Sequence, residues 1–585
     1  MRFLYVLTVF LFSVTAYAQG LKTHGKTIVD KNGHEVILRG MGLGGWMLQE
    51  PYMLQLIGAA TNQHGIKQKI TELVGEEKTA QFYKAWLNNH CTKADIDSLA
   101  AWGFNMVRVP LHFNLFTLLA EEEPVKGKDT WLKKGFELTD KLLGWCKANS
   151  IYVILDLHAA PGGQGNDLAI SDRDTSKSSL WNNQTNQQKT VALWQQLAER
   201  YKDNEWVGGY DLINEPNYGF QNQTDRNGCA EKGNEPLVQL YKNITAAIRK
   251  VDKKHIIYIE GNCWANNYNG IAPLWDDNMV ISFHKYWNNT NKASIQDFLD
   301  MREKYNVPLW MGETGENSNA WFTNAIQLFE ENKVGWTWWP LKKMGINNPM
   351  RIPSNSNYQA IIDYWKGNGK KPTAAMAFKG LMQLAKDTRA SNTIMQRDVI
   401  DAMVRQVRTD ETLPYKDNII QPNSILYAVD YDFGKREYAY SDKDSGTYWV
   451  SNNIRTDWNK GWQYRNDCVD IETCKDSITN GYNVGWIEDG EWMQYTVYSN
   501  TDAVYDVNIR SASKETEGQI TFLLGNKQQI ILLPATGDHQ LWKTTKAKNI
   551  RLQKGWNKIR MLATKGGFNL NYMQFINTVN TAQNN

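Results

Sequence analysis

Eight short apolar runs alternate with stretches of helical periodicity between residues 36 and 338 of this 585-residue chain. Apolar runs without polar alternation indicate strands that are buried on both faces, and parallel strands need helical crossovers of this kind. Eight such units favour a closed (β/α)8 barrel, the TIM barrel, over an open sheet. The predicted strands are Val36–Gly40, Met106–Val109, Tyr152–Asp156, Gly209–Ile213, Ile256–Glu260, Val280–Phe283, Pro308–Gly312 and Gly335–Trp338.

Helical stretches separate these strands, and two further helices close the repeat. Ahead of the first strand, Lys26–Arg39 indicates strand, turn and strand, because Asp30–Gly33 is a strong hairpin-turn sequence. The predicted helices are Ala94–Trp102, Phe136–Asn149, Thr190–Tyr201, Leu237–Val251 and Ser294–Tyr305, with closing helices at Ala374–Asp387 and Val399–Val407.

The sequence pattern changes after Pro422. Segments such as Trp492–Val497 and Tyr505–Ile509 are short, alternate in polarity and are bounded by Gly, Asn and Asp. This pattern predicts an all-β sandwich of the jelly-roll kind. We therefore expect a signal peptide at 1–18, a barrel with closing helices at 19–410, a short linker at 411–422, the sandwich at 423–578 and a tail at 579–585.

The N-terminus has the features of a secretory signal. Arg2 gives a positive start, Phe3–Val14 is apolar, and Ala16–Ala18 fits an A-x-A cleavage site. We expect a mature chain that begins near Gln19 and is secreted to the periplasm, the cell surface or the medium. No later apolar run reaches membrane-spanning length. A net charge of +3 without a basic block gives no reason to expect a nucleic-acid partner, and we expect a monomer.

The six cysteines suit an oxidising compartment but are too few for a disulfide-based fold. Two pairings are open, Cys229 with Cys263 and Cys468 with Cys474. Neither C-x-x-C nor H-E-x-x-H occurs, so a zinc site is not expected. We expect the chemistry to need no metal and no organic cofactor.

Two carboxylates follow predicted strands directly. Glu215 comes after Gly209–Ile213, and Glu313 comes after Pro308–Gly312. Because the C-terminal ends of barrel strands meet at one face, both side chains should reach the same site. Cleavage of a glycosidic bond needs one carboxyl to give a proton and another to attack the sugar carbon. The 24 Trp and 27 Tyr suit the same interpretation, because flat aromatic rings stack on the C–H faces of sugars.

Between residues 21 and 390 the chain resembles glycoside hydrolase family 5. The motifs that carry the resemblance are Val107–Pro110, Asp156–Gly162, Asn214–Pro216, His284–Tyr286, Glu313 and Trp339.

The resemblance implies that Glu215 is the acid/base and Glu313 the nucleophile of a retaining enzyme. Arg108 and Tyr286 would then support Glu313. The sugar in subsite −1 would contact His158, Asn214 and His284, with Trp339 as its platform.

These assignments have alternatives. Glu316, three residues beyond Glu313, is a rival nucleophile, and the two histidines could be structural. Gly40–Gly45 matches the G-x-G-x-x-G of dinucleotide-binding proteins, but no suitable βαβ unit with an acidic partner follows it. We instead expect the first barrel loop there, with Trp46 near the sugar cleft.

From about residue 423 to 577 the chain resembles carbohydrate-binding module family 6, through runs such as Tyr482–Ile487 and Gly490–Val497. Where that family carries calcium-ligating acids, this chain has Tyr427, Val429 and Asn571, so we expect no bound calcium. His539 replaces a stacking Trp of the family's usual sugar cleft. Tyr464, Trp486 and Asn569 stay candidate sugar contacts, and the alternative is a domain that only braces the barrel.

The sequence therefore predicts a secreted, retaining β-glycoside hydrolase that takes a polysaccharide or oligosaccharide substrate. Leu157–Gln164 and Gly335–Lys342 resemble family members that act on β-1,3- and β-1,6-glucans, which favours exo cleavage with release of glucose. An endo-β-1,4-glucanase is the main alternative. Two further hypotheses are a transglycosylase and a non-catalytic glycan-binding protein on a degenerate barrel.

Overall fold

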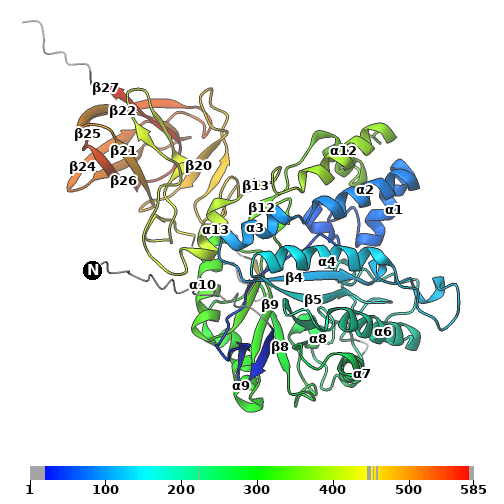
Figure 1. Ribbon diagram of the computed structural model, residues 1–585. Coiled ribbons are helices and arrows are strands. Elements are labelled where there is room, and N and C mark those ends of the chain that lie inside the picture. Colours follow the sequence, from blue (N-terminus) through cyan, green and yellow to red (C-terminus); the bar gives the residue numbers. More distant parts are fainter. Residues whose placement is uncertain (1–19, 223, 445–449, 452–453, 456–458, 579–585) are drawn as a thin grey trace, which may run out of the picture.

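The computed structural model describes residues 20–578, apart from 223, 445–449, 452–453 and 456–458 (Figure 1). The predicted signal peptide and the C-terminal tail lie outside the described residues. Among the described residues, no helix combines the length and the apolar character needed to cross a membrane.

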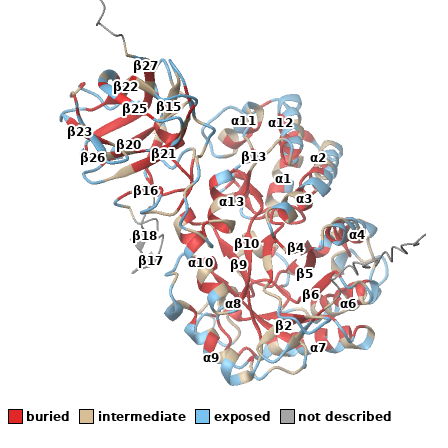
Figure 2. Cartoon of the chain, turned by 60° about the vertical axis from the view of Figure 1, so that its left-hand side comes forward, coloured by how far each residue is buried: buried red, intermediate tan, exposed pale blue. Residues whose placement is uncertain are grey.

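Eight parallel strands close into a barrel in the order β10-β3-β4-β5-β6-β7-β8-β9, which confirms the predicted fold. β4 and β5 are buried along their whole length, as expected for strands covered on both faces (Figure 2). The strands are β3 (Arg39–Gly42), β4 (Met106–His112), β5 (Tyr152–Ala159), β6 (Val207–Asp211), β7 (Ile257–Glu260), β8 (Met279–Lys285), β9 (Leu309–Gly315) and β10 (Gly335–Trp339).

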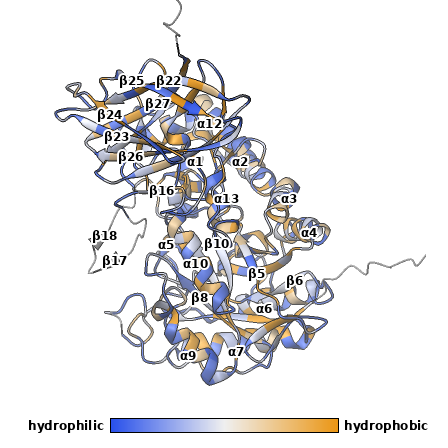
Figure 3. Ribbon diagram, turned by 90° about the vertical axis from the view of Figure 1, so that its left-hand side faces the viewer, coloured by the Kyte–Doolittle hydropathy of each residue, from blue (hydrophilic) through white to orange (hydrophobic). Residues whose placement is uncertain are grey.

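Amphipathic helices surround the barrel, and α3 and α4 alternate hydrophilic and hydrophobic stretches along their length (Figure 3). The five predicted inter-strand helices are present with shifted ends, and α12 has its predicted bounds. The helices are α1 (Gln63–Val74), α2 (Glu76–Asn89), α3 (Lys93–Ala101), α4 (Lys133–Ala148), α5 (Leu168–Ser171), α6 (Gln184–Tyr201), α7 (Glu235–Val251), α8 (Asn262–Ala265), α9 (Gln296–Tyr305), α10 (Asn319–Glu331), α11 (Ser356–Trp365), α12 (Ala374–Asp387) and α13 (Arg397–Val404).

The N-terminal hairpin lies earlier in the chain than predicted. β1 (Leu21–His24) pairs with β2 (Thr27–Asp30) around a turn at Gly25, whose φ of 56° is left-handed. The predicted turn at Asp30–Gly33 also forms, but only an isolated bridge follows it. Leu21 of this hairpin is buried in a cluster with strand residues of the barrel, so it helps to close the end opposite the site.

The C-terminal part is all β, as predicted, and forms two facing sheets. One sheet has the order β14-β21-β26-β23-β24 with β16 beside β21, and the other has β19-β20-β27-β22-β25 with β15 beside β27. The strands are β14 (Ile419–Ile420), β15 (Ile425–Tyr427), β16 (Tyr440–Ser441), β19 (Ile471–Thr473), β20 (Tyr482–Ile487), β21 (Trp492–Ser499), β22 (Ala503–Ala512), β23 (Gly518–Leu524), β24 (Lys527–Leu533), β25 (Lys543–Leu552), β26 (Gly555–Lys565) and β27 (Phe568–Asn577).

One of the two open cysteine pairings is present. Cys229 and Cys263 form a disulfide, whereas Cys468 and Cys474 are both free and buried. The Cys468–Cys474 pairing was wrong because the Cys468 sulfur faces the Tyr440 hydroxyl at 3.5 Å, while Cys474 packs in a separate small cluster with Ala512 and Trp542.

The sandwich lies beside α10 and α13 (Figure 2). A buried polar network joins it to the barrel there. The backbone N–H of Asn466 donates to Asp398 of α13 at 2.8 Å, and its amide donates to the Asn317 carbonyl at 2.7 Å. Asn319, the first residue of α10, donates to Asp398 at 2.8 Å and to Asp467 at 2.9 Å. Since these groups are buried, each hydrogen bond needs its partner, and the two domains are held in one arrangement.

We predict that Asn466→Ala destabilises the protein. Removing its buried amide deletes the hydrogen bonds that it makes to the Asn317 carbonyl and from the Trp462 indole N–H, which costs about 1–3 kcal/mol. Differential scanning calorimetry should show a lower Tm, whereas the exposed Asn500→Ala in the same domain should leave Tm unchanged. Equal Tm values for the Asn466 and Asn500 variants would contradict this account.

Candidate active site

The two predicted carboxylates meet at the C-terminal end of the barrel. Glu313 lies within β9, and Glu215 lies four residues beyond β6. A register shift between β8 and β9 sets His284 opposite Glu313, and its Nδ1 lies 2.6 Å from Glu215 and 3.8 Å from Glu313. One oxygen of Glu215 and one of Glu313 lie within 4.8 Å of each other and of the His284 ring.

The backbone of Glu215 is left-handed, with a φ of 43°. Its N–H donates to Glu260 at 2.6 Å, and the next residue is Pro216. A non-glycine residue in this conformation costs free energy and persists only where its surroundings enforce it, as at many functional sites.

Arg108 of β4 is fully buried and is the centre of the hydrogen-bond network. It donates to Glu313 and, at 2.8 Å each, to Asp211 and Asn214. Tyr286 donates to the other oxygen of Glu313 at 3.1 Å. The structure therefore places Arg108 and Tyr286 on the two oxygens of Glu313, and their support of a nucleophile stays a prediction.

His158, Asn214 and Trp339 lie together beside these groups. The His158 ring stacks on Trp339 with centroids 4.9 Å apart, and its Nε2 lies 3.3 Å from the Asn214 amide. Trp339 is 4% exposed, and a Cβ at Gly42 would come within 2.3 Å of its ring. The first barrel loop is therefore glycine-rich because Trp339 occupies the adjoining space. The role of Trp339 as sugar platform stays a prediction.

Trp46 has an internal partner, and its place near the sugar cleft stays a prediction. Its indole is buried and donates to the Leu87 carbonyl at 2.8 Å, so it packs between the first loop and α2. β3, which includes Gly42, pairs inside the closed barrel, and the next α-helix, α1, begins only at Gln63. A dinucleotide site needs a helix that starts at its glycine run, so this arrangement argues against that alternative.

Three further acids of the site went unnoticed in the sequence. Asp156, Asp211 and Glu260 are buried, and each lies within 3.2 Å of an Arg108 nitrogen. Each lies at or near the C-terminal end of a barrel strand, the same position that singled out Glu313. A search for every acid at a predicted strand end would find Asp156 and Glu260, whereas Asp211 lies two residues before the predicted end of its strand.

Glu316, the rival nucleophile, faces another partner. Its carboxylate pairs with Lys343 at 2.7 Å, and the Lys343 ammonium lies over the Tyr52 ring. Glu50 lies near the same side of the site, and burial together with the charges of Glu313 and Glu316 raises its pKa well above the ordinary value. No sequence pattern singles out Glu50 or Tyr52, because they lie in the long connection after β3, at a short 3₁₀ helix over Pro51–Leu54.

Burial and charge shift the titration of the central groups. Burial raises the pKa of Glu313 to about 7, against the opposing charges of His284 and Arg108. Burial also lowers the pKa of His158 to about 3. Burial opposes protonation of His284, but the carboxylates of Glu260, Glu313 and Glu215 raise its pKa well above the ordinary value. The site thus combines a neutral His158 with a positively charged His284.

Two groups of three side chains have ligand atoms close enough for a metal ion, Asp156, His158 and Glu313, and Glu215, His284 and Glu313. Arg108 lies 3.2 Å from Asp156 and also binds Glu313, so a cation in the first group would meet its charge. In the second group the raised pKa of His284 favours imidazolium, which is no ligand. These positive charges argue against a metal at either place.

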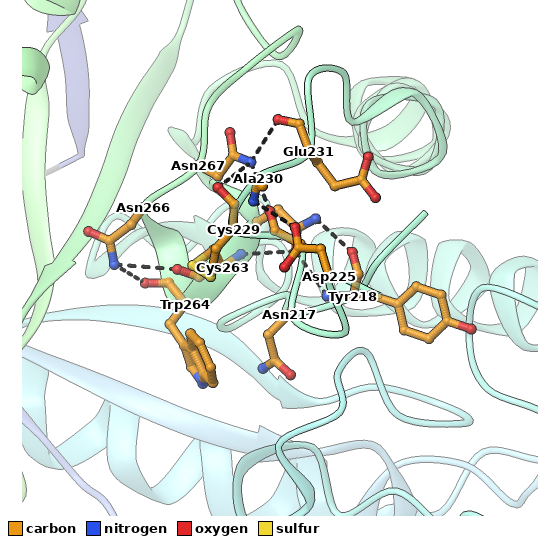
Figure 4. The surroundings of a disulfide bond; sticks show 12 residues. Asn217, Tyr218, Asp225, Cys229, Ala230, Glu231, Cys263, Trp264, Asn266 and Asn267 are labelled. Carbon is orange, nitrogen blue, oxygen red and sulfur yellow. Dashed lines mark hydrogen bonds between the residues drawn. A yellow bond between two sulfur atoms is a disulfide. The ribbon is translucent and has the colours of Figure 1, made fainter. Parts of the chain in front are cut away.

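The Cys229–Cys263 disulfide ties the loop after β6 to α8, which follows β7 (Figure 4). Asn267 strengthens the junction by donating to the carbonyls of Gly228 and Glu231. Trp264, next to the disulfide, donates its backbone N–H to the Pro216 carbonyl at 3.1 Å. The covalent bond therefore ties the loop that carries Glu215 to the segment that follows β7.

The candidate sugar contacts of the sandwich have different environments. The Tyr464 hydroxyl donates to Asp430 at 2.7 Å, and the Asn569 amide donates to Glu472 at 2.7 Å, so both polar groups already have internal partners. Trp486 is 45% exposed. Asn571 donates to Asp476 at 3.0 Å, a bond that an ionised acid at 571 could not make. Sugar binding by these residues stays a prediction.

Comparisons with known proteins agree with this site. The family model described as cellulase, glycosyl hydrolase family 5, matches residues 59–345, and that of carbohydrate binding module family 6 matches residues 463–577.

Three relatives are similar to part of this chain. A β-xylosidase of Phanerodontia chrysosporium is 27% identical in an alignment of 378 residues that covers 58% of this chain and 75% of the relative. A probable glucan 1,3-β-glucosidase A of Aspergillus fumigatus is 24% identical, over 47% of this chain and 62% of the relative's length. Endoglucanase C of Acetivibrio thermocellus is 24% identical, over 48% of this chain and 93% of the relative's length.

The family models and the closed barrel with its two glutamates lead to one conclusion. This chain is a glycoside hydrolase whose residues 59–345 form a glycosyl hydrolase family 5 domain and whose residues 463–577 form a family 6 carbohydrate-binding module.

Proposed function

We propose that this protein is a secreted exo-β-glucanase that releases glucose from β-1,3- or β-1,6-linked glucan with retention of configuration. The observation that carries the proposal is the pair Glu215 and Glu313, whose oxygens approach within 4.8 Å. Retaining enzymes need this close spacing, whereas inverting enzymes leave room for a water between their carboxyls. Export rests on the signal-like residues 1–18.

In the first step Glu313 attacks the anomeric carbon while Glu215 protonates the departing glycosidic oxygen. Arg108 and Tyr286 each hold one oxygen of Glu313, which fixes the attacking carboxylate in place. In the second step Glu215 takes a proton from water, and the water oxygen displaces Glu313 from the sugar. His284, 2.6 Å from Glu215, balances the charge of the pair as the proton moves.

The enclosure of the site favours a chain end over the middle of a chain. Glu215 and Glu313 are 5% and 4% exposed, and Glu50 and Tyr52 wall the site from the first barrel loop. Two of the relatives are named for exo-type action, on xylosides and on 1,3-β-glucan. Because another relative is named endoglucanase C, endo cleavage of β-1,4-glucan is the second candidate function.

We predict that Glu313→Gln abolishes hydrolysis of glucan, because an amide cannot form the glycosyl ester. Glu215→Gln should lower turnover of glucan by about 10²–10⁴-fold but affect an aryl glucoside with an activated leaving group far less. Glu316→Gln is the matched control and should retain most activity, since that carboxylate pairs with Lys343. If Glu316→Gln lost activity while Glu313→Gln retained it, Glu316 and not Glu313 would be the nucleophile.

We predict that glucose, in the β configuration, is the first product from laminarin or pustulan. Proton NMR of the fresh reaction distinguishes β from α before mutarotation, and chromatography follows product size over time. An early α anomer would refute retention. A rapid loss of viscosity of a soluble cellulose derivative, without glucose from the other two glucans, would favour the endo alternative.

We predict an acid limb of kcat/KM nearer pH 7 than pH 4.5. The folded-state pKa of Glu313 is raised to about 7, so lowering the pH through that value protonates the nucleophile. Below it, kcat/KM for an aryl glucoside should fall about tenfold per pH unit. Circular dichroism over the same range controls for unfolding. A limb near 4.5 with the fold intact would contradict the raised pKa.

A further inference from the structure

A loop of the sandwich, residues 459–467, is attached next to the catalytic face. The Asn319 backbone N–H, in the first turn of α10, donates to the Asn466 carbonyl at 3.0 Å. Asn466 in turn donates to the Asn317 carbonyl, and Asn317 is four residues beyond Glu313 in the same segment. We call residues 459–467 the docking loop.

The barrel loop after β8 is anchored on the same turn of α10. The Trp321 indole donates to the Asn288 carbonyl at 2.7 Å, and Asn288 follows Tyr286 and Trp287. Tyr286 reaches Glu313. The docking loop and the loop after β8 are therefore both bonded to the first turn of α10, although one belongs to the sandwich and the other to the barrel.

Each of these two loops presents an exposed tryptophan. Trp287 is 43% exposed and Trp462 is 38% exposed. Their φ values are 47° and 43°, in the left-handed region that bulky residues rarely adopt. The Trp462 indole N–H donates to Asn466 at 3.0 Å, so its ring is held by the buried network. Strain that fixes an exposed ring is expected at a binding surface rather than at a merely solvated position.

Trp486 continues the same surface on the sandwich. It is 45% exposed with a φ of 48°, and a Cβ at Gly461 would come within 3.2 Å of its ring. Gly461 directly precedes Trp462 in the docking loop. A succession of exposed indoles thus leads from β20, through the docking loop, toward the loop that carries Tyr286.

We propose that Trp287 and Trp462, continued by Trp486, form a glycan-binding surface that runs from the barrel onto the sandwich. It binds the sugars of a long β-glucan on the leaving-group side of the bond that is cleaved. Flat rings that stack on sugar C–H faces along a chain suit a polysaccharide, since each added ring contributes contact area. The identity of the chain as β-glucan rests on the proposed function.

Kinetics on long and short substrates test the surface. In Trp462→Ala/Trp486→Ala, the ratio of kcat/KM for laminarin to that for an aryl β-glucoside should fall about tenfold, the effect of losing roughly one stacking contact. Trp462→Phe/Trp486→Ala keeps a ring at position 462, so it should have a higher ratio than the double alanine variant. The matched control is Trp556→Ala. Trp556 is an exposed indole that packs on Tyr498 at the start of β26. The other end of β26 leads to Gly567, which bonds to Ile487 in the strand that carries Trp486, so the control lies at the opposite end. An unchanged ratio in the double variant, or an equal fall in the control, would overturn the proposal.

Binding separates this proposal from the catalytic one. Calorimetry with laminari-, gentio- and cello-oligosaccharides on Glu313→Gln should show affinity that rises with chain length, and adding Trp462→Ala should remove the rise. Affinity that is independent of length for all three series would refute the surface. Length-dependent binding by a parent enzyme that hydrolyses none of the glucans would refute the proposed function and leave the surface standing.

Discussion

The structure of the site depends on one buried cation. The guanidinium of Arg108 is fully buried and lies within hydrogen-bonding reach of Asp156, Asp211, Glu260 and Glu313, which come from four different strands. Burying a charge is costly unless it is paired, so removing any partner would leave charge without compensation. Arg108 therefore fixes the relative positions of the strand ends more than it adds stability. The position of Glu313 follows from that geometry.

Excess negative charge around Arg108 accounts for the unusual titration of the site. Burial raises the pKa of Asp211 to about 7, with Glu260 adding to the rise, and it raises that of Glu313 to a similar value. The same carboxylates hold a proton on His284. The protons and charges of the site are thus shared among groups in contact, and no one of them titrates by itself. A hydrolase that must transfer one proton out and back can use such a network, because the compensating charge is already in place.

The sandwich is part of the same mechanical unit. Its docking loop is hydrogen-bonded to the turn that follows Glu313, and Asp398 of α13 receives bonds from both domains. A module joined only by a flexible linker would sample many orientations. Here the buried network selects one orientation, in which the docking loop is bonded to the turn that follows Glu313. With the glycan-binding surface proposed above, binding by the module and cleavage by the barrel would concern the same length of chain.

The sequence by itself determined the barrel, the all-β second part and the two glutamates, because these rest on local signals. Short apolar runs that recur between helical stretches predict buried parallel strands. A carboxylate just after such a strand reaches the C-terminal face of a barrel. The tertiary structure alone decided which groups meet. Glu260 and Asp211 became parts of the site through Arg108, Trp46 turned inward to Leu87, and Cys474 packed apart from Cys468. Those outcomes depend on register, burial and pairing between distant segments, which no local pattern contains.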